Sequence, residues 1–273
     1  MTAVPARLGD ATWPEVEAAA GHGTTTLLVP LGATEQHGPH LPLGTDSDIA
    51  GVIARVAGAR LPGAVVAPTL PYGASGEHQD FAGTLSIGAE ATELVLVELG
   101  RSASETFDRL LFLNAHGGNA APLAAAVERL RDEGRDVRAW SPRFGGDAHA
   151  GRTETSLMLA RDETSERGRP DPPPPGRGRP KPPIAPVRTT AVPGAPERTT
   201  AVRVGRAEAG NSAPLAELIE DLRAGGVRAV SPNGVLGDPA GASAEEGREL
   251  FAAAVAELCA TIADWPAPVG SAR

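Results

Sequence analysis

Three short segments of the chain combine carboxylates and imidazoles with glycine, and such side chains can bind metal ions together. In the first segment (GATEQHGPHLPLGTD), Glu35 and His37 stand two positions apart in a loop, so we expect their side chains to project to the same side. Asp46 ends this segment at the start of a predicted helix, where it can turn one oxygen toward each of two cations. Mixed nitrogen and oxygen donors of this kind suit zinc, iron or manganese.

The second and third segments add further donors. In the second (NAHGGN), His116 follows an apolar run, and the paired glycines after it let the backbone turn sharply and approach a ligand. Asn119 at its end is placed to cap the helix that follows. The third (HAGRTETS) offers His149 and Glu154 at the entrance of another predicted helix.

Each segment alone has an ordinary explanation, because a single E-x-H or a histidine near a strand end is usually a hydrogen-bonded polar residue. Taken together, the positions of the histidines favour metal binding over this ordinary explanation. His22 stands in a plain turn and predicts nothing, whereas the other five of the six lie in glycine-rich loops beside acidic residues. These five are His37, His40, His78, His116 and His149.

Alternating β-rich runs and amphipathic stretches predict the elements that position these segments. The alternation is typical of a mostly parallel sheet with helices on both faces, so we expect a single-domain α/β fold, a three-layer α/β/α sandwich. Ligands bind such a sheet at the loops leaving the carboxyl ends of its strands. Ser243 and Glu246 predict a capping box for the last helix. The expected strands are 27–31, 65–67, 109–114 and 136–141, and the expected helices are 46–60, 89–106, 120–133, 151–160 and 243–263.

The composition excludes several classes of protein. The 273 residues suffice for one large domain, and no apolar run reaches the roughly 18 residues needed to cross a bilayer. The first ten residues lack a secretory signal, so we expect a cytoplasmic protein. A net charge of −9 without clustered basic residues argues against a nucleic-acid partner. The single cysteine, Cys259, excludes an internal disulfide and is expected to fill the core.

The segment 166–200 differs in composition from the rest of the chain. It holds eleven of the 26 prolines and seven lysines or arginines, with almost no large apolar residue. Such a segment cannot bury enough surface to order itself. We therefore expect a disordered insertion that interrupts one domain spanning residues 1–273, rather than a boundary between two domains.

In order, the three donor-rich segments resemble signature blocks of the creatininase family. A fourth block, residues 72–84 (YGASGEHQDFAGT), is also similar, except that Ala82 stands where a proline is usual. The resemblance covers residues 25–163 and resumes near residue 200, so the proline-rich segment does not belong to it.

The resemblance implies an amide hydrolase with two divalent cations. It implies that Glu35, Asp46 and His116 hold one cation. His37, Asp46 and Glu154 would hold the other, with Asp46 bridging the pair. Two cations in such a site would lower the pKa of a shared water from near 16 to about 7, which suits attack on an amide carbonyl.

His149 and Glu154 are the candidate catalytic residues. By analogy with the family, His149 would hand a proton to the departing nitrogen, a task suited to a group whose ordinary pKa is about 6.5. The alternative role for His149 is a hydrogen bond that orients a metal ligand. Glu154 would serve as a metal-binding carboxylate, because Gly117-Gly118 stands where creatininase itself has Tyr-Glu.

Two features bear on the substrate. Creatininase closes over its small ring with tryptophans, whereas here Trp140 alone lies near a motif, so we expect a substrate larger than creatinine. Residues 210–215 and 222–239 resemble the branch of the family that serves the mycofactocin system. This likeness implies release of a modified C-terminal Val-Tyr dipeptide from a small precursor peptide.

Two other functions stay open at this point. One is a small-molecule amidohydrolase acting on creatinine or a formamide, and the other is a metal-binding scaffold without catalysis. The scaffold is the weaker hypothesis, because a protein that only binds metal does not need a proton donor beside a full set of metal ligands. The resemblance also implies a ring-shaped homo-oligomer, a hexamer or an octamer, although no residue fixes the number of subunits.

Overall fold

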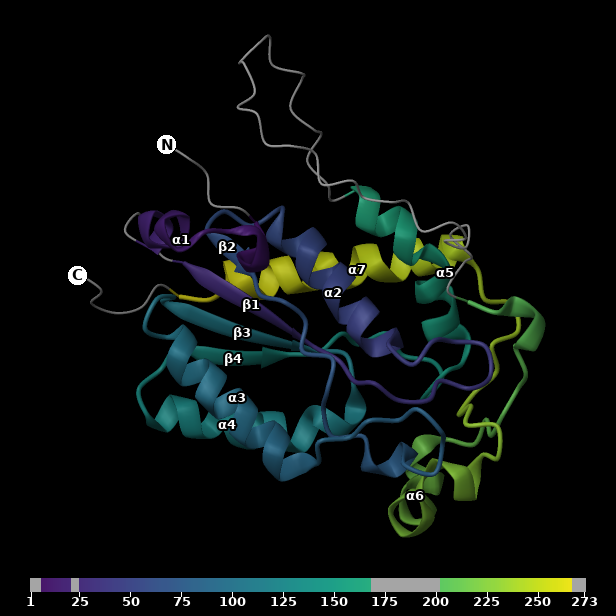
Figure 1. The fold of residues 1–273 in the computed structure, drawn as a ribbon. Coiled ribbons are helices and arrows are strands. Elements are labelled where there is room, and N and C mark those ends of the chain that lie inside the picture. The colour runs from purple at the N-terminus through teal and green to yellow at the C-terminus, as the bar shows by residue number, and fades with distance from the viewer. Residues whose placement is uncertain (1–5, 21–24, 168–201, 267–273) are drawn as a thin grey trace, which may run out of the picture.

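The computed structural model describes residues 6–20, 25–167 and 202–266. Within these residues the strands form one sheet in which all neighbours are parallel and the order is β2-β1-β3-β4 (Figure 1). The strands are β1 (Thr26–Leu31), β2 (Ala64–Val66), β3 (Arg109–Asn114) and β4 (Val137–Trp140).

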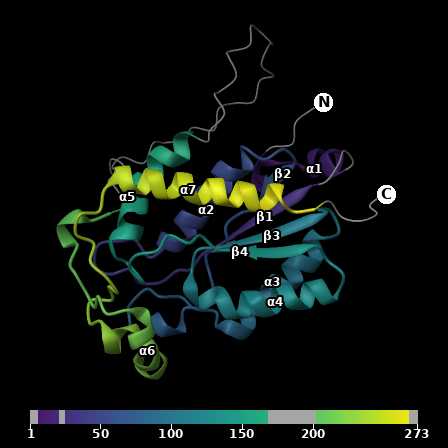
Figure 2. The ribbon, with the colours of Figure 1, turned by 180° about the vertical axis from the view of Figure 1, so that it is seen from behind.

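Helices cover both faces of this sheet (Figures 1 and 2), which confirms the expected three-layer α/β/α sandwich. One face carries α2 (Thr45–Gly58) and α7 (Ala244–Ala263), with α5 (Arg152–Arg167) packed against both. The other face carries α3 (Ala89–Ala103) and α4 (Ala120–Asp132). The remaining elements are α1 (Trp13–Ala20), α6 (Leu215–Val230), η1 (Leu8–Asp10), η2 (Gly76–His78), η3 (Gly117–Asn119) and η4 (Val204–Arg206).

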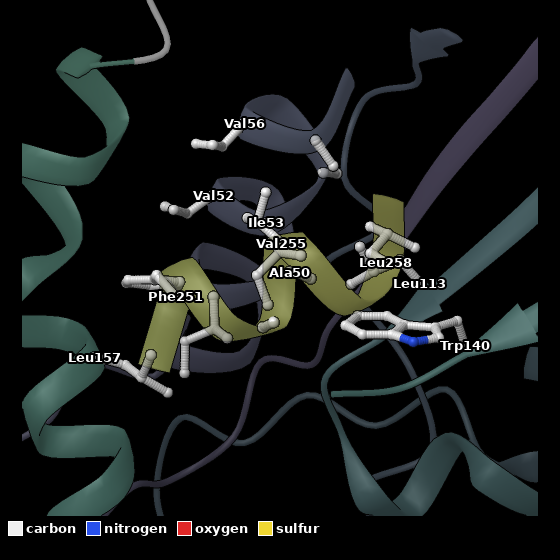
Figure 3. Close-up of a cluster of buried hydrophobic side chains, with 14 of the residues drawn as sticks. Ala50, Val52, Ile53, Val56, Leu113, Trp140, Leu157, Phe251, Val255 and Leu258 are labelled. Atoms are coloured by element: carbon white, nitrogen blue, oxygen red, sulfur yellow. The ribbon is translucent and has the colours of Figure 1, made fainter. Parts of the chain in front are cut away.

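The two central strands explain why the sheet has a core on each side. Every residue of β1 and β3 is buried, as expected of parallel strands covered by helices on both faces. Figure 3 shows the side chains of α2 and α7 meeting in one cluster, with Leu113 of β3 and Trp140 of β4 beside Leu258. Cys259 packs against the edge of this cluster and is only partly buried.

The elements differ from expectation in a few places. Helices α1 and α6 were not predicted, and α5 runs seven residues beyond the expected end at residue 160, to Arg167. The predicted insertion at 166–200 falls almost entirely outside the described residues. No helix in the described part of the chain has both the length and the apolar character needed to cross a bilayer.

The two predicted helix caps have different outcomes. The hydroxyl of Ser243 accepts a hydrogen bond from the backbone N–H of Glu246 at 3.2 Å, which confirms the cap of α7. The prediction that the side chain of Asn119 caps α4 is wrong. That amide is instead bound to backbone groups of two other loops, at Gly32 and Ala74, where it helps to assemble the site.

Candidate metal centre

The three donor-rich segments meet at the carboxyl ends of the strands. The first leaves β1 and the second leaves β3, and these strands are neighbours in the sheet. Asn119 ties the segments together, because its Nδ2 donates to Gly32 O at 3.0 Å and its Oδ1 accepts from Ala74 N at 2.9 Å. His149 of the third segment contacts the first segment directly, since its Nε2 donates to Gln36 O at 2.8 Å, and its backbone pairs with Leu236.

Glu35, Asp46 and His116 form one group of possible ligands. All three are almost fully buried, and each offers an atom within 4.8 Å of the others. The Nε2 atom of His116 lies 3.3 Å from Glu35 Oε2, and its Nδ1 atom lies 3.4 Å from Asp46 Oδ2. This is the set that the sequence predicted for the first cation.

The second group contains His37 and Glu154, as predicted, but its third member is His149. The expected third member, Asp46, lies close by, since its Oδ1 is 3.1 Å from His37 Nε2. Glu154 Oε2 lies 3.9 Å from the same nitrogen. The two oxygens of Asp46 therefore face two different histidines, His37 and His116, which places Asp46 between the two groups.

The carboxylates at the centre of the site are buried without hydrogen bonds. Both oxygens of Glu35 and the Oδ2 atom of Asp46 have no hydrogen-bond partner among the described residues. A buried carboxylate without a partner is costly, whereas a cation supplies the missing contacts. The donor set thus fits divalent cations, because hard oxygen atoms and imidazole nitrogens converge on the same buried volume.

Backbone carbonyl groups orient the three histidines of these groups. A carbonyl only accepts, so the ring nitrogen beside it carries hydrogen and the opposite nitrogen is left to face the carboxylates. The pairs are His37 Nδ1 with Glu35 O (3.2 Å), His116 Nε2 with Ala74 O (2.8 Å) and His149 Nε2 with Gln36 O (2.8 Å). In the neutral form of each ring, the opposite nitrogen is available to a ligand or a proton.

The buried charges shift the pKa values of these groups strongly. Burial alone lowers the pKa of His37, but the neighbouring Asp46 and the charge of Glu154 outweigh it and raise the pKa to about 10. Burial likewise opposes the charged form of His116, yet Glu35 and Asp46 raise its pKa to about 9. Burial raises the pKa of Glu154 to about 7.

These shifts predict that cation binding to the metal-free protein releases protons. The pKa values of His37 and His116 lie above their ordinary value near 6.5, so both imidazoles stay charged at pH 7 and stabilise the site until the pH rises through about 9 to 10. A cation needs the neutral rings, so binding should release about two protons and strengthen by up to roughly 100-fold per pH unit. Titration calorimetry with zinc between pH 6.5 and 8, in two buffers of different ionisation enthalpy, measures both quantities. Binding that neither releases protons nor depends on pH would contradict the assignment of these rings.

The other histidines separate into three cases. His40 is buried, but its Nε2 atom bonds to the hydroxyl of Thr155 at 2.9 Å, outside both ligand groups. His78 lies in the site with its Nε2 atom 3.3 Å from Glu35 Oε1, although the sequence assigned it no role. Its position in a glycine-rich loop beside Glu77 was the available signal. His22 lies outside the described residues.

A comparison with protein-family models matches residues 9–262 to the family described as "Creatininase: Creatinine amidohydrolase". The chain belongs to the creatininase family. This membership supports a hydrolase that acts on C–N bonds, and together with the two ligand groups it supports binding of divalent metal. It also agrees with the observed parallel sheet between helical layers.

Known relatives fall into two sets. A curated protein of Mycobacterium ulcerans (strain Agy99) named "Mycofactocin precursor peptide peptidase" is 46% identical over 270 residues, which cover 95% of this chain and 89% of the relative. Among solved creatininase structures, a variant of Zn-Zn type has a TM-score of 0.68 at 24% identity and covers 94% of this chain and 96% of its own. A structure titled "Creatininase Mn" has a TM-score of 0.67 at 23% identity, and the match covers 96% of this chain and 98% of that structure's chain.

Gly118 lies within the site, in the dipeptide for which the resemblance to creatininase implies Tyr-Glu. A Cβ atom at this position would lie 2.2 Å from Ala74 O and 2.5 Å from His116 Nε2, so no side chain fits there. The nearest carboxylate is that of Glu77, whose Oε1 would lie 2.7 Å from that Cβ and is 4.0 Å from His116 Nε2. A metal-binding glutamate at position 118 is therefore excluded by the backbone around it.

Proposed function

We propose that this creatininase-family chain is a peptidase that uses two divalent cations to release the modified C-terminal Val-Tyr dipeptide from the mycofactocin precursor peptide. The observation that carries the two-cation part is the position of Asp46, whose two oxygens face His37 and His116 in different ligand groups. The name and the high identity of the Mycobacterium ulcerans relative support the substrate.

The proposed first cation is held by Glu35, Asp46 and His116 and the second by His37, Asp46 and Glu154. When bound, the two cations would lower the pKa of a water and polarise the amide carbonyl. Zinc, iron and manganese all suit the donors, and the Zn-Zn and Mn forms of the structural neighbours favour zinc or manganese.

His149 and Glu154 are the proposed catalytic residues. Because His149 Nε2 donates to Gln36 O, its Nδ1 atom is bare, and burial holds the pKa of the ring well below the ordinary value. The neutral ring can take a proton from the attacking water and return it to the nitrogen of the broken amide bond. Glu154 accepts a hydrogen bond from Ala150 N at 2.6 Å, which fixes one of its oxygens beside His37.

The surroundings of Trp140 favour a peptide over a small ring. Trp140 was the one tryptophan near a motif, and the structure places it in the core between β4 and α7 (Figure 3). It is 7% exposed, so it is not positioned to close over a substrate. Because creatininase uses tryptophans for this purpose, creatinine and formamides are the weaker substrate proposals.

The proposal predicts cleavage that depends on metal and on modification of the peptide. Metal-loaded protein incubated with the modified precursor peptide should yield a dipeptide-sized fragment by mass spectrometry, and the unmodified peptide should yield none. Prior removal of metal with a chelator should abolish the fragment, and added zinc or manganese should restore it. Turnover of creatinine without peptide cleavage would favour the small-molecule function, and metal binding without any hydrolysis would favour the scaffold.

We further propose that the protein acts in the cytoplasm as a homo-oligomer of six or eight subunits, as the family resemblance implies. Light scattering coupled to size-exclusion chromatography measures the mass directly. A monomer would contradict this part of the proposal without affecting the catalytic assignment.

A further inference from the structure

Gln36 is a buried amide between two proposed ligands, Glu35 and His37, and all of its side-chain polar atoms have partners. Its Oε1 accepts from Gly38 N at 2.9 Å. Its Nε2 donates to Gly234 O at 3.1 Å and contacts His78 Nδ1 at 2.8 Å. The backbone N–H of Gly38 can only donate, so it fixes which end of the amide is oxygen.

This amide determines which nitrogen of His78 carries hydrogen. Since Gln36 Nε2 is a donor, the Nδ1 atom of His78 must accept, and the hydrogen of the neutral ring sits on Nε2. That N–H faces Glu35 Oε1 at 3.3 Å, an oxygen that has no hydrogen bond among the described residues. A small rotation of the carboxylate would align the two groups.

His149 faces the same oxygen with the opposite arrangement. Its Nε2 lies 2.8 Å from Gln36 O and 3.1 Å from Gln36 Nε2, and the shorter contact to the carbonyl assigns the hydrogen to Nε2. Its bare Nδ1 lies 3.9 Å from Glu35 Oε1. Through its amide and its carbonyl, Gln36 therefore holds the hydrogen on Nε2 of both rings, so that His78 presents an N–H to Glu35 Oε1 and His149 presents a bare nitrogen.

This arrangement decides between two roles for His78. Glu35, His78 and His149 are close enough together to suggest a third cation site. A ring nitrogen that carries hydrogen cannot bind a metal, however, and the nitrogen of His78 that faces Glu35 carries one. His78 is therefore suited to donate to Glu35 and not to bind a cation.

We propose that Gln36 and His78 form a positioning pair for Glu35, an inference that rests on the proposed metal centre. Gln36 holds the hydrogen of His78 on Nε2, and this N–H restrains Glu35 Oε1. The restraint leaves Glu35 Oε2 to the cation that Glu35 would share with Asp46 and His116, whose Nδ1 is the nitrogen not bonded to Ala74 O. Hydrogen-bonded partners of this kind orient metal ligands and raise the affinity for the metal.

The loop that carries His78 is braced as a positioning role requires. Gly226 of α6 has φ +68°, and a Cβ atom there would lie 2.7 Å from Glu77 O, so the kink of the helix packs directly on this loop. Arg228 donates to Asp80 O at 3.2 Å, and its guanidinium lies 4.2 Å from the centre of the Phe81 ring. A rigid support of this kind keeps the His78 ring in the narrow range of orientations in which it can restrain Glu35.

Two variants of His78 test the pair through metal affinity. Glutamine can place an amide N–H where His78 Nε2 stands, whereas the shorter side chain of asparagine reaches only the position of Nδ1. Competition with a chromogenic chelator should therefore show that His78→Asn weakens the tighter zinc site by about 10- to 100-fold. His78→Gln should recover most of that affinity. Equal affinities in the wild type and His78→Asn would overturn the proposal, as would equal losses in both variants.

Nitrogen NMR of metal-free protein labelled in histidine reads the hydrogen positions directly. The wild type should show His78 with hydrogen on Nε2 and a bare Nδ1, the signal being assigned by its loss in His78→Asn. In Gln36→Glu a carboxylate replaces the donor, so hydrogen should appear on His78 Nδ1. A hydrogen on Nδ1 in the wild type would overturn the assignment.

The two measurements separate failure of this pair from failure of the proposed function. Wild-type protein that binds no zinc would contradict the metal centre, while the NMR spectrum would still decide the state of His78. Three zinc ions per chain in the wild type, falling to two in both His78 variants, would show that His78 is a ligand and would overturn the positioning role.

Discussion

Replacing Asp46 by asparagine is expected to reduce peptide hydrolysis by on the order of 10³-fold or more, because the proposed shared ligand of both cations would be lost. The two oxygens of Asp46 face His37 and His116 from a buried position. An amide has nearly the same shape, but it has one oxygen and no charge, so it cannot serve both groups. We therefore expect the variant to bind less than one cation per chain when its metal content is measured by mass spectrometry.

Asp48→Asn is the matched control for this variant. Asp48 stands two residues along the same helix, and its side chain is 40% exposed and pairs with Arg161. A surface pair of this kind contributes little to stability, so both cations and the activity should be retained. Circular dichroism establishes that each variant is folded. Full metal content in folded Asp46→Asn would exclude Asp46 as the shared ligand of the two cations.

The elements of the fold that could be predicted are those whose burial gives the sequence a regular apolar pattern. The strands β1 and β3 are covered on both faces, so nearly every residue in them is apolar and the pattern is plain. Helix α6 was missed because Gly225 and Gly226 interrupt its pattern, and the backbone of Gly226 is not helical. Helix α1 buries none of its residues, so it has no apolar stripe to recognise.

The candidate site could be predicted as a set of residues but not as a set of contacts. Glu35, His37 and Asp46 stand close together in the sequence, so their grouping follows from the local chain. The contact of His149 with the second group depends instead on backbone pairing with Leu236, 87 residues away in the chain. The role of Gln36 could not be predicted either. An uncharged amide indicates no particular chemistry in the sequence, and its contact with His78 is formed only in the fold.

Asn119 stands at the position that the capping rule predicts, but its side chain does not cap the helix. Its type and place suit a helix cap, and it does stand at the N-terminal boundary of α4. Its side chain instead bonds to Gly32 and Ala74, because assembling three loops leaves backbone groups that need buried partners. Local propensity identified the position of this residue, and tertiary contacts determined its function.

Gly118→Ala is expected to lower the free energy of unfolding by about 3 kcal/mol, which corresponds to a fall in Tm of roughly 6 to 12 °C. The added Cβ would stand 2.2 Å from Ala74 O, a backbone atom that cannot turn aside as a flexible side chain can. It would also stand 2.5 Å from His116 Nε2, so relief of the clash must displace a proposed ligand. Cation affinity should therefore fall together with stability.

The neighbouring glycine supplies the control, since a Cβ atom at Gly117 meets nothing within 4 Å. Gly117→Ala should melt close to the wild type and bind cations normally, although it changes the same dipeptide in the same way. Differential scanning calorimetry of both variants, with and without zinc, separates the loss of stability from the loss of metal. Equal melting temperatures for the two variants would mean that the backbone at Ala74 leaves room for a side chain. The glutamate that creatininase has at this position would then be missing here for a reason other than space.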